Sequence, residues 1–192
     1  MSGLHIFTEE LSAKICFNSL LAKLAPQVGC KKVKVYSHEG RLGLMRALRT
    51  TLPAISRREG ASILVTIDQD KSDCEELKEK LEEILREKCE CAYKIRIVCK
   101  ELEAWFLGDL DAIAKAYPRF DPSHYRTKAK MRDVDGIVQS HQMLLKIIPE
   151  YRGEKHFSKT EVSEKISAHL SLDSNTSTSF QNTILAIRSL IK

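Results

Sequence analysis

The sequence has no long apolar run and no segment typical of secretion. No apolar stretch in its 192 residues approaches the ~18 residues that a spanning helix needs. The amino-terminal segment MSGLHIFTEE lacks the basic region and the apolar region of a signal peptide. We therefore expect a cytoplasmic protein, with its six cysteines present as reduced thiols.

Several motifs with well-defined chemistry are also missing. The cysteines form no CxxC pair and no Cys/His cluster with zinc-ligand spacing, which argues against a zinc site. Neither GxGxxG nor GxxxxGKS/T occurs, so the chain has no recognisable phosphate-binding loop. The six histidines are scattered and suggest no Ser/His/Asp arrangement. Any linked ATP hydrolysis is therefore expected in another chain.

What the sequence does contain is typical of a soluble α/β protein. Hydrophobic residues make up 43% of the chain and charged residues 30%, which is enough apolar material for one good core. Strand-like runs at 4–7, 33–36, 62–67 and 93–99 alternate with segments of helical periodicity. This alternation predicts crossover connections and a mainly parallel four-stranded sheet flanked by helices.

The pattern changes after Tyr117. Residues 1–117 are predicted to form the α/β domain, and 118–192 a C-terminal helical extension packed on it. Within that extension, 119–135 is expected to be a loop, and helices are expected at 137–148, 160–170 and 178–191.

Local signals mark several helix ends. Pro26 is expected to end its helix, and Pro53 to end or bend the next one. Ser72 with Glu75 fits a capping box for the helix that follows the third strand.

Acidic side chains follow three of the predicted strands: Glu9 and Glu10, then Asp68 and Asp70, then Glu101 and Glu103. The carboxyl ends of parallel strands meet at one edge of a sheet, where ligands bind. If the chain stays extended, Asp68 and Asp70 point to the same side. Such a cluster repels itself unless a cation is bound, and carboxylate oxygens are preferred ligands of magnesium and manganese. The pattern predicts a Mg²⁺ or Mn²⁺ site that activates water against a phosphate ester.

Each of these residues also has a structural interpretation. Asp70, and Asp73 beyond it, suit the cap of the next helix. The two glutamates after the first strand suit the positive N-terminal end of a helix. Glu101 and Glu103 lie about 200° apart on a helix, so they cannot both face one ion.

Basic residues gather in one early segment and again around 126–132. The early group is a candidate track for a phosphate backbone and includes Lys31, Lys32, Lys34, Arg41, Arg46 and Arg49. A solvated charged surface is the alternative. Lys155 or Lys159 is a candidate for neutralising a scissile phosphate, with an ordinary exposed lysine as the alternative. Trp105 and Phe106 lie on a helical stripe expected in the core, where it would hold Glu103 in place.

Four segments carry a resemblance to a known family: FTEELSA, VTIDQDKSDCEELKEKL, VCKELEAWFLGD and YRGEK…SFQNTILAIRSL. They span nearly the whole chain, and ELEAWFLGD is the most specific. An acidic residue after strand one, a D-x-D after strand three and a glutamate after strand four resemble the toprim domain. That domain occurs in topoisomerases, primases and overcoming-lysogenization-defect (OLD) nucleases. More narrowly, the chain is identified as a member of a small toprim-like family catalogued as domain of unknown function 4276.

The resemblance implies a toprim-like (Rossmann-like) fold and roles for four residues. Glu9 takes the position of the toprim glutamate, a general base or acid and a candidate metal ligand. Asp68 and Asp70 match the D-x-D, and Glu103 matches the later acidic residue. Family members often lie beside a gene for an ABC-type or OLD-like ATPase in clusters tied to phage defence. The resemblance therefore implies a nuclease effector controlled by such an ATPase partner.

The chain departs from the toprim pattern after Glu9. Glu10 replaces a glycine, and Ala13 and Lys14 stand near the place of a second acid, which favours a single magnesium over a two-metal site. The expected function is a metal-dependent nuclease acting on DNA or RNA. The metal ligands would be Glu9, Asp68 and Asp70, with Glu103 also catalytic; secondary candidates are Glu10, Asp73, Glu101 and Lys155. The alternatives are a non-catalytic subunit that docks on and regulates an ATPase, and a small-molecule phosphatase.

Overall fold

The computed structural model of the chain describes residues 3–28 and 32–191. These residues form a four-stranded sheet in which every pair of neighbouring strands is parallel. The strands pair in the order β2-β1-β3-β4 and comprise β1 (Gly3–Thr8), β2 (Val33–Ser37), β3 (Ala61–Asp68) and β4 (Ala92–Val98). The predicted α/β class and parallel sheet are confirmed.

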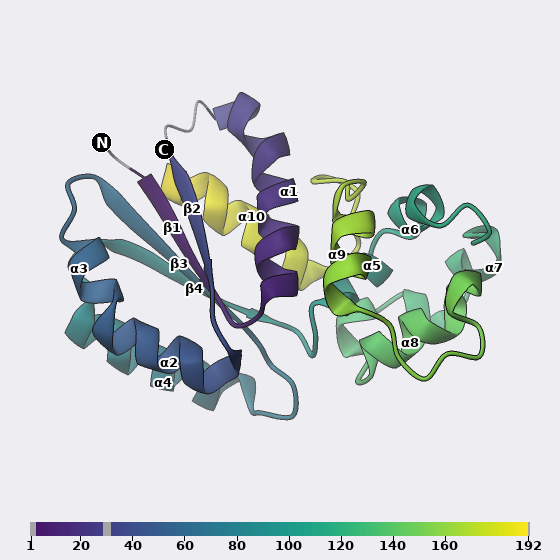
Figure 1. Cartoon of the computed structure of the whole chain (residues 1–192), viewed down its shortest axis with the longest axis horizontal. Coiled ribbons are helices and arrows are strands. Elements are labelled where there is room, and N and C mark those ends of the chain that lie inside the picture. Colours follow the sequence, from purple (N-terminus) through teal and green to yellow (C-terminus); the bar gives the residue numbers. More distant parts are fainter. Residues whose placement is uncertain (1–2, 29–31, 192) are drawn as a thin grey trace.

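Helices cover both faces of this sheet (Figure 1). One face carries α1 (Leu11–Val28) and α10 (Thr178–Ile191); the other carries α2 (Gly40–Thr50), α3 (Leu52–Ser56) and α4 (Cys74–Lys88). The central strand β3 is apolar on both sides for this reason. Its Ile63 and Val65 join the core beneath α2, α3 and α4, whereas Leu64 joins the core on the α1 and α10 side.

A group of shorter helices lies at one end of the molecule, beside the sheet (Figure 1). They are α5 (Glu103–Leu107), α6 (Leu110–Ala116), α7 (Ser123–Arg126), α8 (Ser140–Ile147) and α9 (Lys159–Ser167). Helix α9 packs against α1, and α8 packs against α5. The predicted loop at 119–135 is therefore partly helical, and Met131 and Val134 tie it to the core.

The two prolines behave differently. Helix α1 continues past Pro26 to Val28, because a proline in the last turn removes only one backbone hydrogen bond. The expected interruption at Pro53 is confirmed: α2 ends at Thr50 and a new helix starts at Leu52, with the proline in its first turn.

The cap of α4 differs from the capping box expected at Ser72. Asp73 is the N-cap residue, and its Oδ1 accepts from the backbone N–H groups of Glu75 at 2.9 Å and Glu76 at 3.0 Å. The hydroxyl of Ser72 instead accepts a hydrogen bond from Arg41. Asp73 therefore has the structural role that its alternative interpretation predicts.

Trp105 anchors the short helix α5 in the core, as its helical stripe predicts. Its side chain is 0% exposed and makes edge-to-face contacts with Phe17 and Phe180, at centroid distances of 5.7 and 5.4 Å. Its Nε1 donates to Ser179 Oγ at 3.1 Å. Helix α10, which carries Ser179, lies on the sheet against β4 and β3. The predicted domain boundary at residue 117 stays a prediction.

In the part of the chain that the structure describes, every helix is too short or too polar to cross a membrane.

Candidate functional site

The acidic residues after β1, β3 and β4 come together at the carboxyl edge of the sheet. Glu9 directly follows β1, and Asp68 is the last residue of the neighbouring strand β3. Burial raises the pKa of Asp68 well above its usual range, and the charges of Glu103, Glu9 and Asp70 raise it further. The other three predicted catalytic acids therefore lie close enough to Asp68 to affect its ionisation.

Asp68 stands where two connections meet. Its Oδ2 accepts from the backbone N–H of Leu102 at 3.4 Å, just before α5 begins. Its backbone carbonyl accepts from Arg41 Nη2 at 2.8 Å, at the start of α2. These hydrogen bonds fix the end of β3 from both faces of the sheet. They hold the Asp68 carboxylate close to other negatively charged side chains.

Two buried carboxylate oxygens have no hydrogen-bond partner among the described residues: Glu9 Oε2 and Glu103 Oε2. Burial also raises the pKa of Glu9, an effect that the charge of Arg41 partly offsets. Glu103 is 3% exposed, and its other oxygen lies 3.4 Å from His141 Nδ1. Leaving such oxygens unpaired is costly, and a bound ion or water is a common explanation.

A small void of about 10 Å³ lies beside Glu9 and is bounded by Glu9, Glu10 and Asp68 among others. That volume is near the ~10–15 Å³ needed for one water-sized particle. The unpaired oxygens, the clustered negative charge and the oxygen-only donors fit a hard divalent cation. Mg²⁺ or Mn²⁺ is therefore compatible with the residues present.

The turn after β3 does not follow the extended path that the D-x-D pattern suggests. Asp70 has a φ of 52° and Lys100, in the adjacent connection, has a φ of 60°. The two loops are joined because Asp70 N donates to Lys100 O at 2.8 Å. In this left-handed turn the Asp70 carboxylate lies 3.0 Å from Arg41 Nη2. The chain is therefore not extended at Asp70, which was the condition for both aspartates to point to one side, and their joint binding of one ion stays a prediction.

Two basic side chains compensate part of the acidic cluster. Arg41, expected on a separate backbone track, instead pairs with Asp70 inside the site. Lys159 Nζ lies 3.1 Å from Glu10 Oε2. Burial lowers the pKa of Lys159, but Glu103, Glu10 and Asp68 raise it by more, so its pKa lies above its ordinary value. Lys159 therefore stays charged beside the acids.

The remaining secondary candidates lie outside this arrangement. Lys155 is exposed and joins no ion pair within residues 3–28 and 32–191, so Lys159 is the lysine that the structure brings to the acids. Glu101 Oε2 accepts from the backbone N–H of His141 at 2.9 Å and thus serves the start of α8. The sequence alone does not predict a role for His141, because its only signal is a position near the start of a predicted helix.

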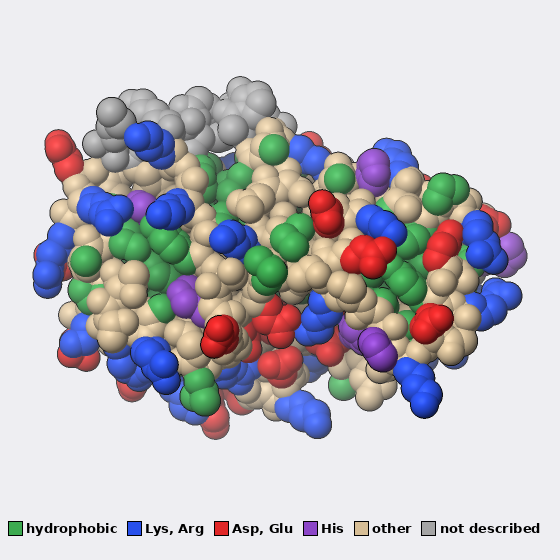
Figure 2. All heavy atoms as spheres, in the orientation of Figure 1, with side chains coloured by type: hydrophobic (Ala, Val, Ile, Leu, Met, Phe, Trp, Pro, Cys, Tyr) green, Lys and Arg blue, Asp and Glu red, His purple; other side chains and the backbone are tan. Residues whose placement is uncertain are grey.

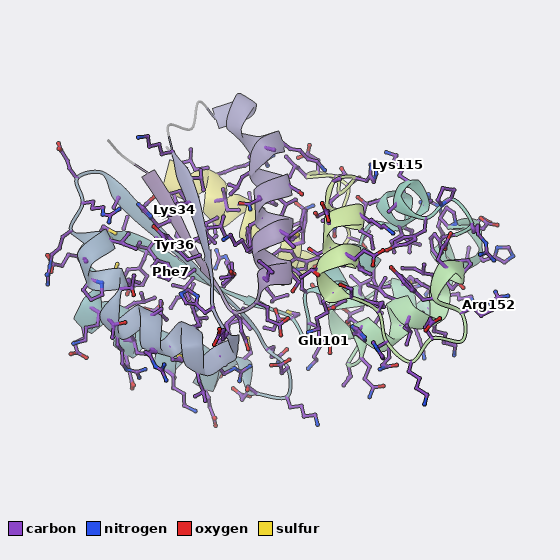
Figure 3. All side chains as sticks on the ribbon, viewed as in Figure 1. Phe7, Lys34, Tyr36, Glu101, Lys115 and Arg152 are labelled. Atoms are coloured by element: carbon purple, nitrogen blue, oxygen red, sulfur yellow. The ribbon has the colours of Figure 1, made fainter. Side chains whose placement is uncertain are left out.

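The predicted basic track is not continuous. Lys31 lies outside the described residues. Lys32 and Lys34 line a hollow at the amino ends of the strands, the opposite end from the acids; Figure 3 shows Lys34 far along the sheet from Glu101. Arg46 and Arg49 are exposed on α2. Lys32 and Lys34 lie near the amino end of β2, whereas Arg46 and Arg49 lie on α2, which begins beyond the carboxyl end of β2.

Asp and Glu side chains gather at the lower centre of the molecule, where the sheet meets the shorter helices (Figure 2). Within the described ranges, however, no three His, Cys, Asp or Glu side chains converge as a preformed metal-binding group. The ion pairs of Arg41 and Lys159 hold two of the acids, Asp70 and Glu10, against cations of the chain. A metal ion would compete with these two side chains.

An all-parallel α/β sheet with an acidic carboxyl edge and a group of helices beside it defines the class of this protein. The family model described as "Domain of unknown function (DUF4276)" matches residues 8–187, so the chain belongs to that family, as its motifs predict. Neither a curated protein nor a solved structure matches the chain at a significant level.

Proposed function

We propose that this protein is a toprim-like, metal-dependent nuclease that hydrolyses phosphodiester bonds of DNA or RNA. The observation that supports this best is the pair of unpartnered buried oxygens on Glu9 and Glu103. They belong to the same cluster as Asp68, whose pKa is raised by burial and by its neighbours' charges. A protein gains nothing in stability from such a cluster, and perturbed acids of this kind are typical of functional sites.

Each group has a distinct part in the proposed reaction. Glu9, Asp68 and Asp70 would hold Mg²⁺ or Mn²⁺, which supplies a polarised water and offsets charge developing on the phosphorus. Glu103, fixed on α5 beside His141, would orient a water for attack on the phosphorus. Lys159, kept charged by the acids around it, neutralises an oxygen of the scissile phosphate.

The family resemblance supports an ABC- or OLD-type ATPase as partner and a role in antiphage defence. The ion pairs at Asp70 and Glu10 suit an effector that is held inactive until a partner rearranges them. The same ion pairs, and the lack of a preformed metal-binding group in the described part of the chain, favour the second candidate function, a non-catalytic subunit that docks on and regulates the ATPase.

The Glu9→Gln substitution tests the proposal. Labelled single-stranded DNA, duplex DNA and RNA are incubated with the protein and Mg²⁺, Mn²⁺ or EDTA, alone and with the partner ATPase. We expect cleavage only with metal, and a loss of about 10²–10⁴-fold in the variant, because a ligand and proton acceptor is removed. Glu39→Gln is the matched control, since Glu39 is exposed and its side chain makes no cap hydrogen bond.

Unchanged cleavage by Glu9→Gln would contradict the assignment of the site. No cleavage by the unaltered protein under any of these conditions would favour the regulatory subunit.

A further inference from the structure

We propose that a groove over the start of α8 binds a single-stranded nucleic-acid backbone and leads it to the acidic cluster. The inference rests on the proposed nuclease function and names the path of its substrate. Two hollows make up this groove, which we call the α8 groove. One, of about 560 Å³, is lined by Arg41, Asp70 and His141 of the site; the other, of about 530 Å³, is lined by Lys130 and Lys146 among others.

The two hollows are adjacent, because three residues line both of them. Val138, Gln139 and Gln142, at and just before the start of α8, line both. A chain lying along α8 in the second hollow reaches the first hollow by crossing these three residues. The first hollow is lined by Asp70 and Arg41, and Arg41 donates to the carbonyl of Asp68 at the end of β3.

The charge of the α8 groove favours a polyanion. Its lining holds four basic side chains, Arg41, Lys71, Lys130 and Lys146, against three acidic ones, Asp70, Glu101 and Asp133. Asp70 pairs with Arg41, whereas Glu101 and Asp133 accept hydrogen bonds from backbone N–H groups and keep their charge. Three lysines along the groove are exposed and form no ion pair within the described part of the chain: Lys71, Lys130 and Lys146. Uncommitted cations spaced along a groove are the usual electrostatic footprint of a phosphate backbone.

The other side chains and the size of the groove favour a single strand. Gln139 and Gln142 offer amide donors and acceptors, and Val138, which is 69% exposed, offers an apolar contact for a base or sugar. Each hollow has the volume of a small-molecule pocket, roughly 300–1,000 Å³. A duplex, whose major groove alone is about 12 Å wide, does not enter such a space. Helix α8 is about 12 Å long, enough for about three stacked nucleotides.

Binding is measured by fluorescence anisotropy with 12-nucleotide oligothymidine DNA and oligouridine RNA. EDTA is present, so that metal and cleavage play no part. We expect Lys130→Ala/Lys146→Ala to raise the Kd by about tenfold or more, and to reduce the slope of log Kd against log salt by about 1.4, or 0.7 for each lost contact. The matched control is Lys78→Ala/Lys94→Ala, because both lysines are exposed and line neither hollow.

The folded state of each variant is checked by circular dichroism, and a Lys→Gln pair replaces the alanine pair if that pair lowers Tm. Weaker binding of either oligonucleotide by the groove variant alone supports the inference. An unchanged Kd, an equal loss in the control pair, or equal competition by a 12-residue oligoglutamate would overturn it. If the nuclease proposal alone fails, both oligonucleotides still bind through the groove, but no metal leads to their cleavage.

Discussion

The Asp68→Asn substitution is expected to make the protein more stable and, at the same time, inactive. Burial and the charges of Glu103 and Glu9 oppose ionisation of Asp68, so a neutral amide relieves this repulsion. The amide oxygen can still accept from Leu102 N. We expect the free energy of unfolding in EDTA at pH 7 to rise by about 1–2 kcal/mol, and cleavage to fall at least about 100-fold.

The pH dependence gives the same prediction an internal check. Because the folded-state pKa of Asp68 lies above its usual 3.8, the folded protein holds this proton more tightly than the unfolded chain. Stability of the unaltered protein in EDTA should therefore fall as pH rises from about 3.8 through the folded-state pKa, and the variant should lack this contribution. Chemical denaturation across pH measures both. A destabilised variant with normal cleavage would mean that Asp68 serves only the fold.

The Trp105→Ala substitution should cause the largest loss of stability. Trp105 is fully buried, packs against Phe17 and Phe180, and donates to Ser179 Oγ. We expect the free energy of unfolding to fall by about 3–5 kcal/mol, measured by denaturant titration. Leu185→Ala on α10 is the control, since Leu185 is 57% exposed and should cost less than about 0.5 kcal/mol. Equal effects of the two substitutions would mean that α5 is not anchored through its tryptophan.

Trp105 belongs to the distinctive segment ELEAWFLGD, and other residues of this segment also hold neighbouring elements in place. Glu101 serves the start of α8, and Asp109 accepts from the backbone N–H groups of Ala112 and Ser171. A side chain at Gly108 would overlap Asn175. The segment therefore joins α5, α6, α8 and the approach to α10, and Glu103 is held within this junction.

The sheet and its acidic edge can be predicted from the sequence because both depend on local patterns. The apolar run of β3 indicates a buried parallel strand, and the rule that such strands share a carboxyl edge brings Glu9, Asp68 and Glu103 together. Their placement at one edge of the sheet needs no knowledge of side-chain contacts. The cap at Asp73 follows from equally local chemistry.

Long-range contacts account for what the sequence does not predict. The Lys159 contact with Glu10 joins residues 149 positions apart, and His141 reaches Glu103 across 38 positions. Neither pairing leaves a periodic or compositional signal. The left-handed conformation of Asp70 depends on the bond to Lys100 in a different loop, which a D-x-D motif does not reveal.

Direct measurement of Mn²⁺ binding tests the central claim, that the acids at the carboxyl edge hold a catalytic cation. Free Mn²⁺ is followed by electron paramagnetic resonance during titration of the unaltered protein and of Asp68→Asn. Saturable binding of a single ion that the Asp68→Asn variant loses is the predicted result. Equal binding by both proteins, or no binding by either even with the proposed ATPase partner present, would contradict the account.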